Sequence, residues 1–176
     1  MTTPESILDD ANALAPDMTR LRHALHRHPE VGLHLPRTQQ RVLEWLEPLG
    51  LEVALGESLS SVTAVLRGAH PSLRGAEAKD RPAVLLRADM DALPLTELTG
   101  LPYASQTGDT MHGCGHDLHT TMLAGAATLL AARRDELAGD VVLMFQPGEE
   151  GDGGAERMIR EGVLEASVRR VEAAYG

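Results

Sequence analysis

The sequence is poor in aromatic residues and in basic charge, and each shortage excludes a class of protein. Aromatic residues make up 2% of the 176 residues, so the surface lacks the stacking platforms that bind single-stranded nucleic acid. Lysine and arginine number 16 against 26 acidic residues, which gives a formal net charge of −10. A chain this acidic offers no basic footprint to a phosphate backbone. We therefore expect no nucleic-acid partner.

Cysteine and long apolar runs are also scarce. The one cysteine, Cys114, excludes an internal disulfide and fits a reducing cytoplasm. No apolar run approaches the ~18 residues of a membrane-spanning helix. The opening segment MTTPESILDD has neither the basic nor the apolar part of a secretory signal. The expected location is therefore the cytoplasm, without membrane contact.

Helical spacing and short apolar runs alternate along the chain. Helices are predicted over residues 4–28, 37–49, 117–133 and 154–161, and strands over residues 51–55, 62–67, 83–86, 141–145 and 171–175. Residues 68–81 and 92–115 have no period and are predicted to be loops, the second long enough to be functional. The alternation predicts an α/β fold with a mostly parallel sheet flanked by helices.

Three polar clusters follow strands of this sheet or open a helix. The first contains Arg87, Asp89 and Asp91, the second is the segment HGCGHD at residues 112–117 with nearby His119, and the third is Glu149 with Glu150. Ligands of open α/β sheets bind outside the carboxyl ends of the strands. The three clusters can therefore converge on one crevice.

Cys114 and His116 flank a single glycine. Alternate side chains of an extended segment share a face, so both can reach one ion, and a thiolate with an imidazole suits zinc and similar metals. Two other interpretations stay open at this point. Cys114 can be an inert buried residue beside a helix-capping histidine, or a nucleophile activated by His112, His116 or His119.

Glu149 and Glu150 are adjacent carboxylates, which need a cation or a proton to relieve their repulsion. In a turn, one can bind a metal while the other stays free as a general base. A solvated acidic turn is the alternative.

Two further sets of polar residues carry weaker signals. Asp89 and Asp91 can bind a metal, support a metal-bound histidine or cap a strand end, with Arg87 as the natural partner of one of them. The histidines at 23, 26 and 28 are predicted to lie at the surface near the end of the first helix, where its dipole favours positive charge.

Taken together, residues 21–32, 85–105, 111–127 and 142–165 resemble the amidohydrolase branch of the M20 peptidase family. That branch includes aminoacylase-like, hippurate hydrolase-like and indoleacetyl-amino-acid hydrolase-like enzymes. The resemblance implies a zinc-peptidase-like catalytic domain with a pair of divalent metals, drawn from Zn, Mn, Co and Ni. It implies metal binding by Cys114, His116 and Glu150, with Glu149 as general base and Asp91 steadying the metal site. Asp89 falls where other branches place a metal-binding histidine.

The resemblance also implies that residues 1–176 are the N-terminal part of a catalytic domain. Two further metal-binding histidines and the lid domain, which carries dimerisation in family members that are often homodimers, are not in the sequence. The implied reaction is hydrolysis of the amide bond of N-acyl amino acids or similar small amides. For this chain we expect at most one bound metal, little hydrolase activity and self-association through exposed sheet edges. The alternative is an inactive fragment or a binding remnant of such an enzyme.

Overall fold

The structure, a computed structural model, describes residues 3–176. Within these residues, two helices and two strands come first, and strands and helices then alternate from residue 83 onward. The helices are α1 (Pro4–Arg27), α2 (Pro36–Leu46), α3 (His116–Ala131) and α4 (Gly154–Arg160), and the strands are β1 (Glu52–Leu55), β2 (Val62–Leu66), β3 (Ala83–Asp89), β4 (Asp140–Gln146) and β5 (Ala173–Tyr175).

Local sequence signals fix the ends of the first two helices. Thr3 caps α1 through a reciprocal pair of hydrogen bonds with Ser6, and Pro4 occupies the first turn, where its missing N–H costs nothing. The predicted second helix over 37–49 is divided into α2 and a short 3-10 turn. Gly50 ends that turn with φ +63°, a left-handed conformation that glycine adopts without strain.

The five strands form one sheet in the order β1-β2-β4-β3-β5. Strand β3 pairs in parallel with β4 and with β5, whereas β2 pairs antiparallel with β1 and β4. The expected α/β sheet flanked by helices is therefore present, and β2 alone runs against the other strands. The short 56–61 connection explains this reversal, because a short loop joins antiparallel strands whereas a parallel pair needs a long crossover.

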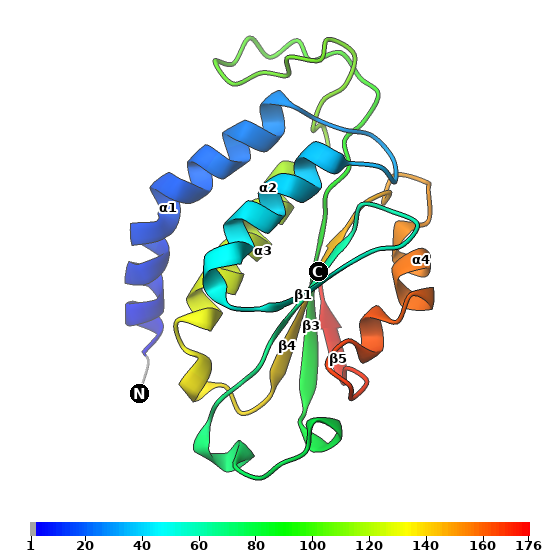
Figure 1. The fold of residues 1–176 in the computed structure, drawn as a ribbon. Coiled ribbons are helices and arrows are strands. Elements are labelled where there is room, and N and C mark those ends of the chain that lie inside the picture. The colour runs from blue at the N-terminus through cyan, green and yellow to red at the C-terminus, as the bar shows by residue number, and fades with distance from the viewer. Residues whose placement is uncertain (1–2) are drawn as a thin grey trace.

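Strand β4 lies inside the sheet and separates two apolar cores. Val141, Leu143 and Phe145 pack on the side of α1, α2 and α3, and the alternate residues Val142 and Met144 pack on the side of α4. Figure 1 shows the same arrangement, with the sheet between three helices on one face and α4 on the other. All seven residues of β4 are buried, as expected of a strand covered on both faces.

The parallel pairing of β3 with β4 brings two polar strand ends together. Asp89 at the end of β3 lies opposite Gln146 at the end of β4. The predicted long loop over 92–115 leaves β3 at this end and projects beyond the helices (Figure 1). An antiparallel bridge between Leu93 and Met111 closes its base. The loop therefore returns the chain to the sheet end where it began.

The helices and the sheet edges bear on the expected membrane and partner properties. None of the helices formed by residues 3–176 combines the length and the apolar character that a membrane crossing needs. The two edge strands expose apolar side chains, with Val53 and Leu55 on β1 and Tyr175 on β5. Exposed edges of this kind favour association, so self-association of the chain stays a prediction.

The opposite end of the sheet is held by a buried carboxylate. Asp140, at the start of β4, accepts hydrogen bonds from Arg67 at 2.7 Å and from Arg81 at 2.7 and 3.0 Å. Burial raises the pKa of Asp140, but the hydrogen bonds from the two arginines and from the Gly68 amide outweigh it, so the pKa lies below the ordinary 3.8. The ionised form is the one that joins β4 to the segments around β2 and β3.

Replacement of Asp140 by alanine is expected to lower the free energy of unfolding by about 3 kcal/mol at neutral pH, because it removes the buried carboxylate that pairs with both Arg67 and Arg81. Since the folded-state pKa is depressed, this contribution is present above pH 3.8 and is lost as the pH falls further. Urea unfolding of both chains between pH 3 and 7 measures the difference. Glu156→Ala is the control, because its pair with Arg160 is exposed and is worth ~0.5 kcal/mol or less. Equal losses in the two variants would contradict the assignment.

Candidate metal centre

Two of the predicted metal ligands come from the junction between the long loop and α3. Cys114 is exposed, and His116 is the first residue of α3 and is buried. Gly115 between them has φ +87°, in the left-handed region that side chains avoid. This one glycine allows the chain to turn sharply from Cys114 into the helix.

The third predicted ligand, Glu150, comes from the turn after β4. The Sγ atom of Cys114, a ring nitrogen of His116 and a carboxylate oxygen of Glu150 all lie within 4.8 Å of one another. The Nε2 atom of His116 is 3.9 Å from Oε1 of Glu150 and 3.8 Å from Oε2 of Glu149. The Glu149 side chain is 42% exposed against 29% for Glu150. The structure thus brings all three proposed ligands together, with Glu149 beside them and more open to solvent.

Asp91 connects the parts of this site that come from different segments. Its side chain is 1% exposed, and its two carboxylate oxygens accept hydrogen bonds from the backbone amides of Glu149 at 2.9 Å and Glu150 at 3.0 Å. Its backbone oxygen accepts the Nδ1 hydrogen of His116 at 2.8 Å. With Nδ1 engaged, Nε2 of His116 is the nitrogen left to bind a metal.

Electrostatics at the site favour positive charge. Burial raises the pKa of Asp91, yet the hydrogen bonds from His116 and from the two amides leave it below its ordinary value. Burial lowers the pKa of His116, but hydrogen bonding to Asp91 and the charge of Asp89 raise it overall. A hydrogen bond to Glu150, with neighbouring negative charge, raises the pKa of Cys114 to about 11. Without a metal, the thiol and the imidazole therefore hold on to their protons.

Asp89 has a different set of partners. Its Oδ2 pairs with Nη1 of Arg87 at 2.7 Å, as expected from the sequence, and its Oδ1 accepts the Nδ1 hydrogen of His119 at 2.8 Å. Asp89, His116 and His119 form a second group of possible ligands within 4.8 Å. Because Arg87 already balances the charge of Asp89, the group around Cys114 suits a cation better.

Within residues 3–176, the histidines near Cys114 have other hydrogen-bond partners or none. The Sγ atom of Cys114 lies within 4.8 Å of a carboxylate oxygen of Glu150. Both ring nitrogens of His112 are buried without a partner among residues 3–176, and burial lowers its pKa to about 4. The Nδ1 atoms of His116 and His119 bond to aspartates 91 and 89. The alternative of an inert buried cysteine is wrong, because Cys114 is exposed. The alternative of a nucleophilic cysteine stays a hypothesis.

The prediction that the histidines of the first helix lie at the surface is wrong for His26. This side chain is 5% exposed and contacts Asp117 and Glu97. It is buried because the long loop folds back over the end of α1, which helical spacing within α1 cannot reveal. The one local signal was the four-residue spacing of Arg22 and His26, which puts both on the side that faces Asp117.

The donor set of the site fits a divalent cation. A thiol, an imidazole nitrogen and a carboxylate are the ligand types that zinc and similar transition metals take in proteins. The acidic surroundings would also stabilise the positive charge. Three protein ligands leave further coordination positions open, as in catalytic rather than structural sites.

Curated relatives match most of this chain but extend well beyond it. N-acetylcysteine deacetylase of Bacillus subtilis is 40% identical over 147 residues, which are 84% of this chain and 37% of that protein. Hippurate hydrolase of Campylobacter jejuni is 40% identical over 149 residues, which are 85% of this chain and 36% of that protein. The chain therefore spans little more than a third of the length of these relatives.

Solved structures and a family profile give the same assignment. A crystal structure from Bacillus subtilis, described as a dinuclear metal-binding peptidase of the M20 family, aligns with a TM-score of 0.83 and 38% identity over 94% of this chain and 43% of that one. The profile of peptidase family M20/M25/M40 matches residues 85–176. These residues carry most of β3, the long loop, the site and β5. The chain belongs to peptidase family M20/M25/M40.

Proposed function

We propose that residues 1–176 are the N-terminal part of the catalytic domain of a metal-dependent amidohydrolase that cleaves N-acyl amino acids. The observation that carries this proposal is the convergence of Cys114, His116 and Glu150 within 4.8 Å, with the carboxylate of Glu149 alongside. The substrate class is supported by relatives named for the deacetylation of N-acetylcysteine and the hydrolysis of hippurate. Both names describe an amide between an acyl group and an amino acid.

In this proposal each residue has a separate task. Cys114, His116 and Glu150 would hold a divalent ion, which in such sites lowers the pKa of water and polarises a carbonyl group. Glu149, which is more exposed than Glu150, takes a proton from the attacking water and returns it to the leaving amine. Asp91 keeps both glutamates and His116 in place through the backbone bonds described above.

The number and kind of metal follow from the donors. Three ligands suffice for one ion, so we propose at most one in this chain and two in an intact active site. Zn, Mn, Co and Ni are all candidates, and the thiolate favours the softer ions among them. A catalytically inactive binding remnant with the same half-site is the second candidate, supported by the chain covering only 37% of its relative.

Metal titration of the purified chain tests the ligand assignment. We expect about one equivalent of Zn²⁺ or Co²⁺, bound through three ligands. Cys114→Ser and Glu150→Gln should each abolish stoichiometric binding, because each removes a ligand. Glu149→Gln is the matched control, since it changes the neighbouring carboxylate and should retain binding. Loss of binding in Glu149→Gln with retention in Glu150→Gln would reverse the proposed roles.

A measurement of turnover tests whether residues 1–176 contain a whole active site or only part of one. The metal-loaded chain is expected to hydrolyse N-acetylcysteine or hippurate at least 100-fold more slowly than a full-length relative, because loss of part of a catalytic constellation costs on the order of 10²-fold or more. Amine release, followed by a fluorogenic amine reagent, measures this. Turnover at the rate of a full-length relative would contradict the proposal that residues 1–176 form only part of the site.

The raised pKa of Cys114 predicts that its thiol reacts slowly with alkylating reagents. With a pKa of about 11 in place of 9.0, the thiolate fraction near pH 8 falls by about 100-fold. Alkylation of the metal-free chain by iodoacetamide should therefore lag behind that of an unperturbed thiol. Glu150→Gln should accelerate it, because the largest cause of the raised pKa is removed. Rapid alkylation of the unmodified chain near pH 8 would instead favour a cysteine nucleophile.

A further inference from the structure

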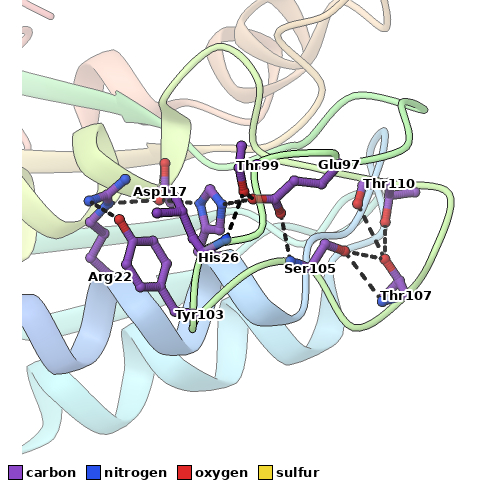
Figure 2. Close-up of polar contacts among 10 residues, drawn as sticks. Arg22, His26, Glu97, Thr99, Tyr103, Ser105, Thr107, Thr110 and Asp117 are labelled. Carbon is purple, nitrogen blue, oxygen red and sulfur yellow. Dashed lines mark hydrogen bonds and ion pairs between the residues drawn. The ribbon is translucent and has the colours of Figure 1, made fainter.

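A buried histidine of α1 joins the two segments that carry the metal ligands. The Nδ1 atom of His26 is 2.8 Å from Oδ2 of Asp117, and its Nε2 atom is 3.3 Å from Oε1 of Glu97. Asp117 directly follows His116 in the first turn of α3, and Glu97 lies in the loop that leads to Cys114. Figure 2 shows His26 between the two carboxylates. The His26 side chain thus links α1 both to the loop that leads to Cys114 and to the first turn of α3.

The two carboxylates are buried and have further partners on the same elements. The Asp117 side chain is 1% exposed, and its Oδ2 also accepts a hydrogen bond from Nε of Arg22 at 3.1 Å. The Glu97 side chain is 2% exposed and accepts hydrogen bonds from Thr99 and from the amide of Ser105. Each of the two carboxylates thus contacts one ring nitrogen of His26.

Glu97 is held in the ionised form that this arrangement requires. Burial raises its pKa, but hydrogen bonds from Thr99, Ser105 and His26 bring it below its ordinary value. Removal of one partner would leave a buried charge uncompensated, which proteins avoid by local rearrangement. The rearrangement would fall on the loop and on the first turn of α3, because this end of α1 is anchored by the buried side chains of Leu21 and Leu25.

The first turn of α3 receives no side-chain cap from its N-cap residue, Gly115. Its position therefore depends on contacts of its own side chains, and the contact of Asp117 with His26 is the one that reaches α1 together with Glu97. The loop is fastened to the same end of α1 by two backbone contacts, from the Gln106 amide to the Arg27 oxygen at 2.9 Å and from the Thr110 hydroxyl to the Pro29 oxygen at 3.2 Å. The end of α1 is therefore the surface on which the Cys114 and His116 segments are aligned.

We propose that His26 is a positioning residue of the metal site, which fixes Cys114 and His116 relative to each other by bridging Glu97 and Asp117. Its polar partners are Glu97 and Asp117 rather than the proposed metal ligands, and it acts through the backbone of the loop and of α3. The inference rests on the proposed metal-binding function. It gives a role to the first segment of the family resemblance, residues 21–32, which the ligand set does not use.

Cobalt spectra of the chain and three variants test this role. His26→Gln and Glu97→Gln remove one or both bridging bonds, and we expect Co²⁺ affinity to fall about tenfold, as when supporting residues of a metal site are replaced. The thiolate-to-cobalt absorption of Cys114 should shift or weaken. Trp45→Phe is the matched control, because Trp45 fastens the middle of α3 through bonds to Ala124 and Thr128. It should destabilise the chain and leave affinity and spectrum unchanged.

Each outcome of this experiment decides the proposal. Folded His26→Gln or Glu97→Gln with the original affinity and spectrum would overturn it, as would an equal change in Trp45→Phe. If His26→Gln fails to fold, Glu97→Gln decides, since it keeps an acceptor for Thr99 and Ser105.

A chain that binds no Co²⁺ would refute the proposed metal site and leave the positioning role to be tested by hydrogen exchange. The amides of Leu118 and His119, which bond to the Gly115 oxygen, should then exchange at least tenfold faster in His26→Gln than in Trp45→Phe. Equal exchange rates in these two variants would overturn the positioning role independently of metal.

Discussion

The carboxylate of Asp91 is the constraint on which the geometry of the site depends. Asp91 follows the end of β3, and its carboxylate accepts hydrogen bonds from the amides of two consecutive residues after β4. The backbone oxygen of Asp91 accepts a hydrogen bond from the first residue of α3. The parallel register of β3 and β4 makes this possible, because it sets the two strand ends side by side. A carboxylate that is only 1% exposed is tolerated there because each of its two oxygens accepts a hydrogen bond from a backbone amide.

The packing that builds the site also places several negative charges close together around His116. His116 has four carboxylates within 3.9 Å of its ring nitrogens, those of residues 89, 91, 149 and 150. In the absence of a metal, protons relieve this repulsion, which explains why the pKa of both His116 and Cys114 is raised. A divalent cation and these protons therefore compete for one set of atoms, and metal binding has to release protons.

The sequence predicts the local helices and strands well, but it does not predict the order of the strands in the sheet. Apolar spacing places α1 and α3 within about two residues of their ends, because buried stripes repeat with the helical period. The third strand was predicted over 83–86 but runs to Asp89, because backbone pairing with β4 continues past the apolar run. Residue type and spacing indicate that Cys114 and His116 can share one ion, whereas the choice of Glu150 over Glu149 as third ligand comes from the family resemblance. The burial of His26 was missed, since it depends on a loop that is distant in sequence and has no period.

The supports of the site all lie within the part of the chain that the structure describes, and this separates two properties of the protein. The turn at Gly115, the Asp91 bonds and the His26 bridge all come from residues 3–176, and they connect the segments that carry Cys114, His116 and Glu150. A half-site whose supports are internal is organised before the metal arrives, so its affinity is not reduced by a cost of ordering the ligands. Under the proposed function, a second ion would need ligands beyond these three. Under the same proposal, binding of one ion and catalysis are therefore separable properties. The first needs only the three ligands of this chain, and the second needs further ligands.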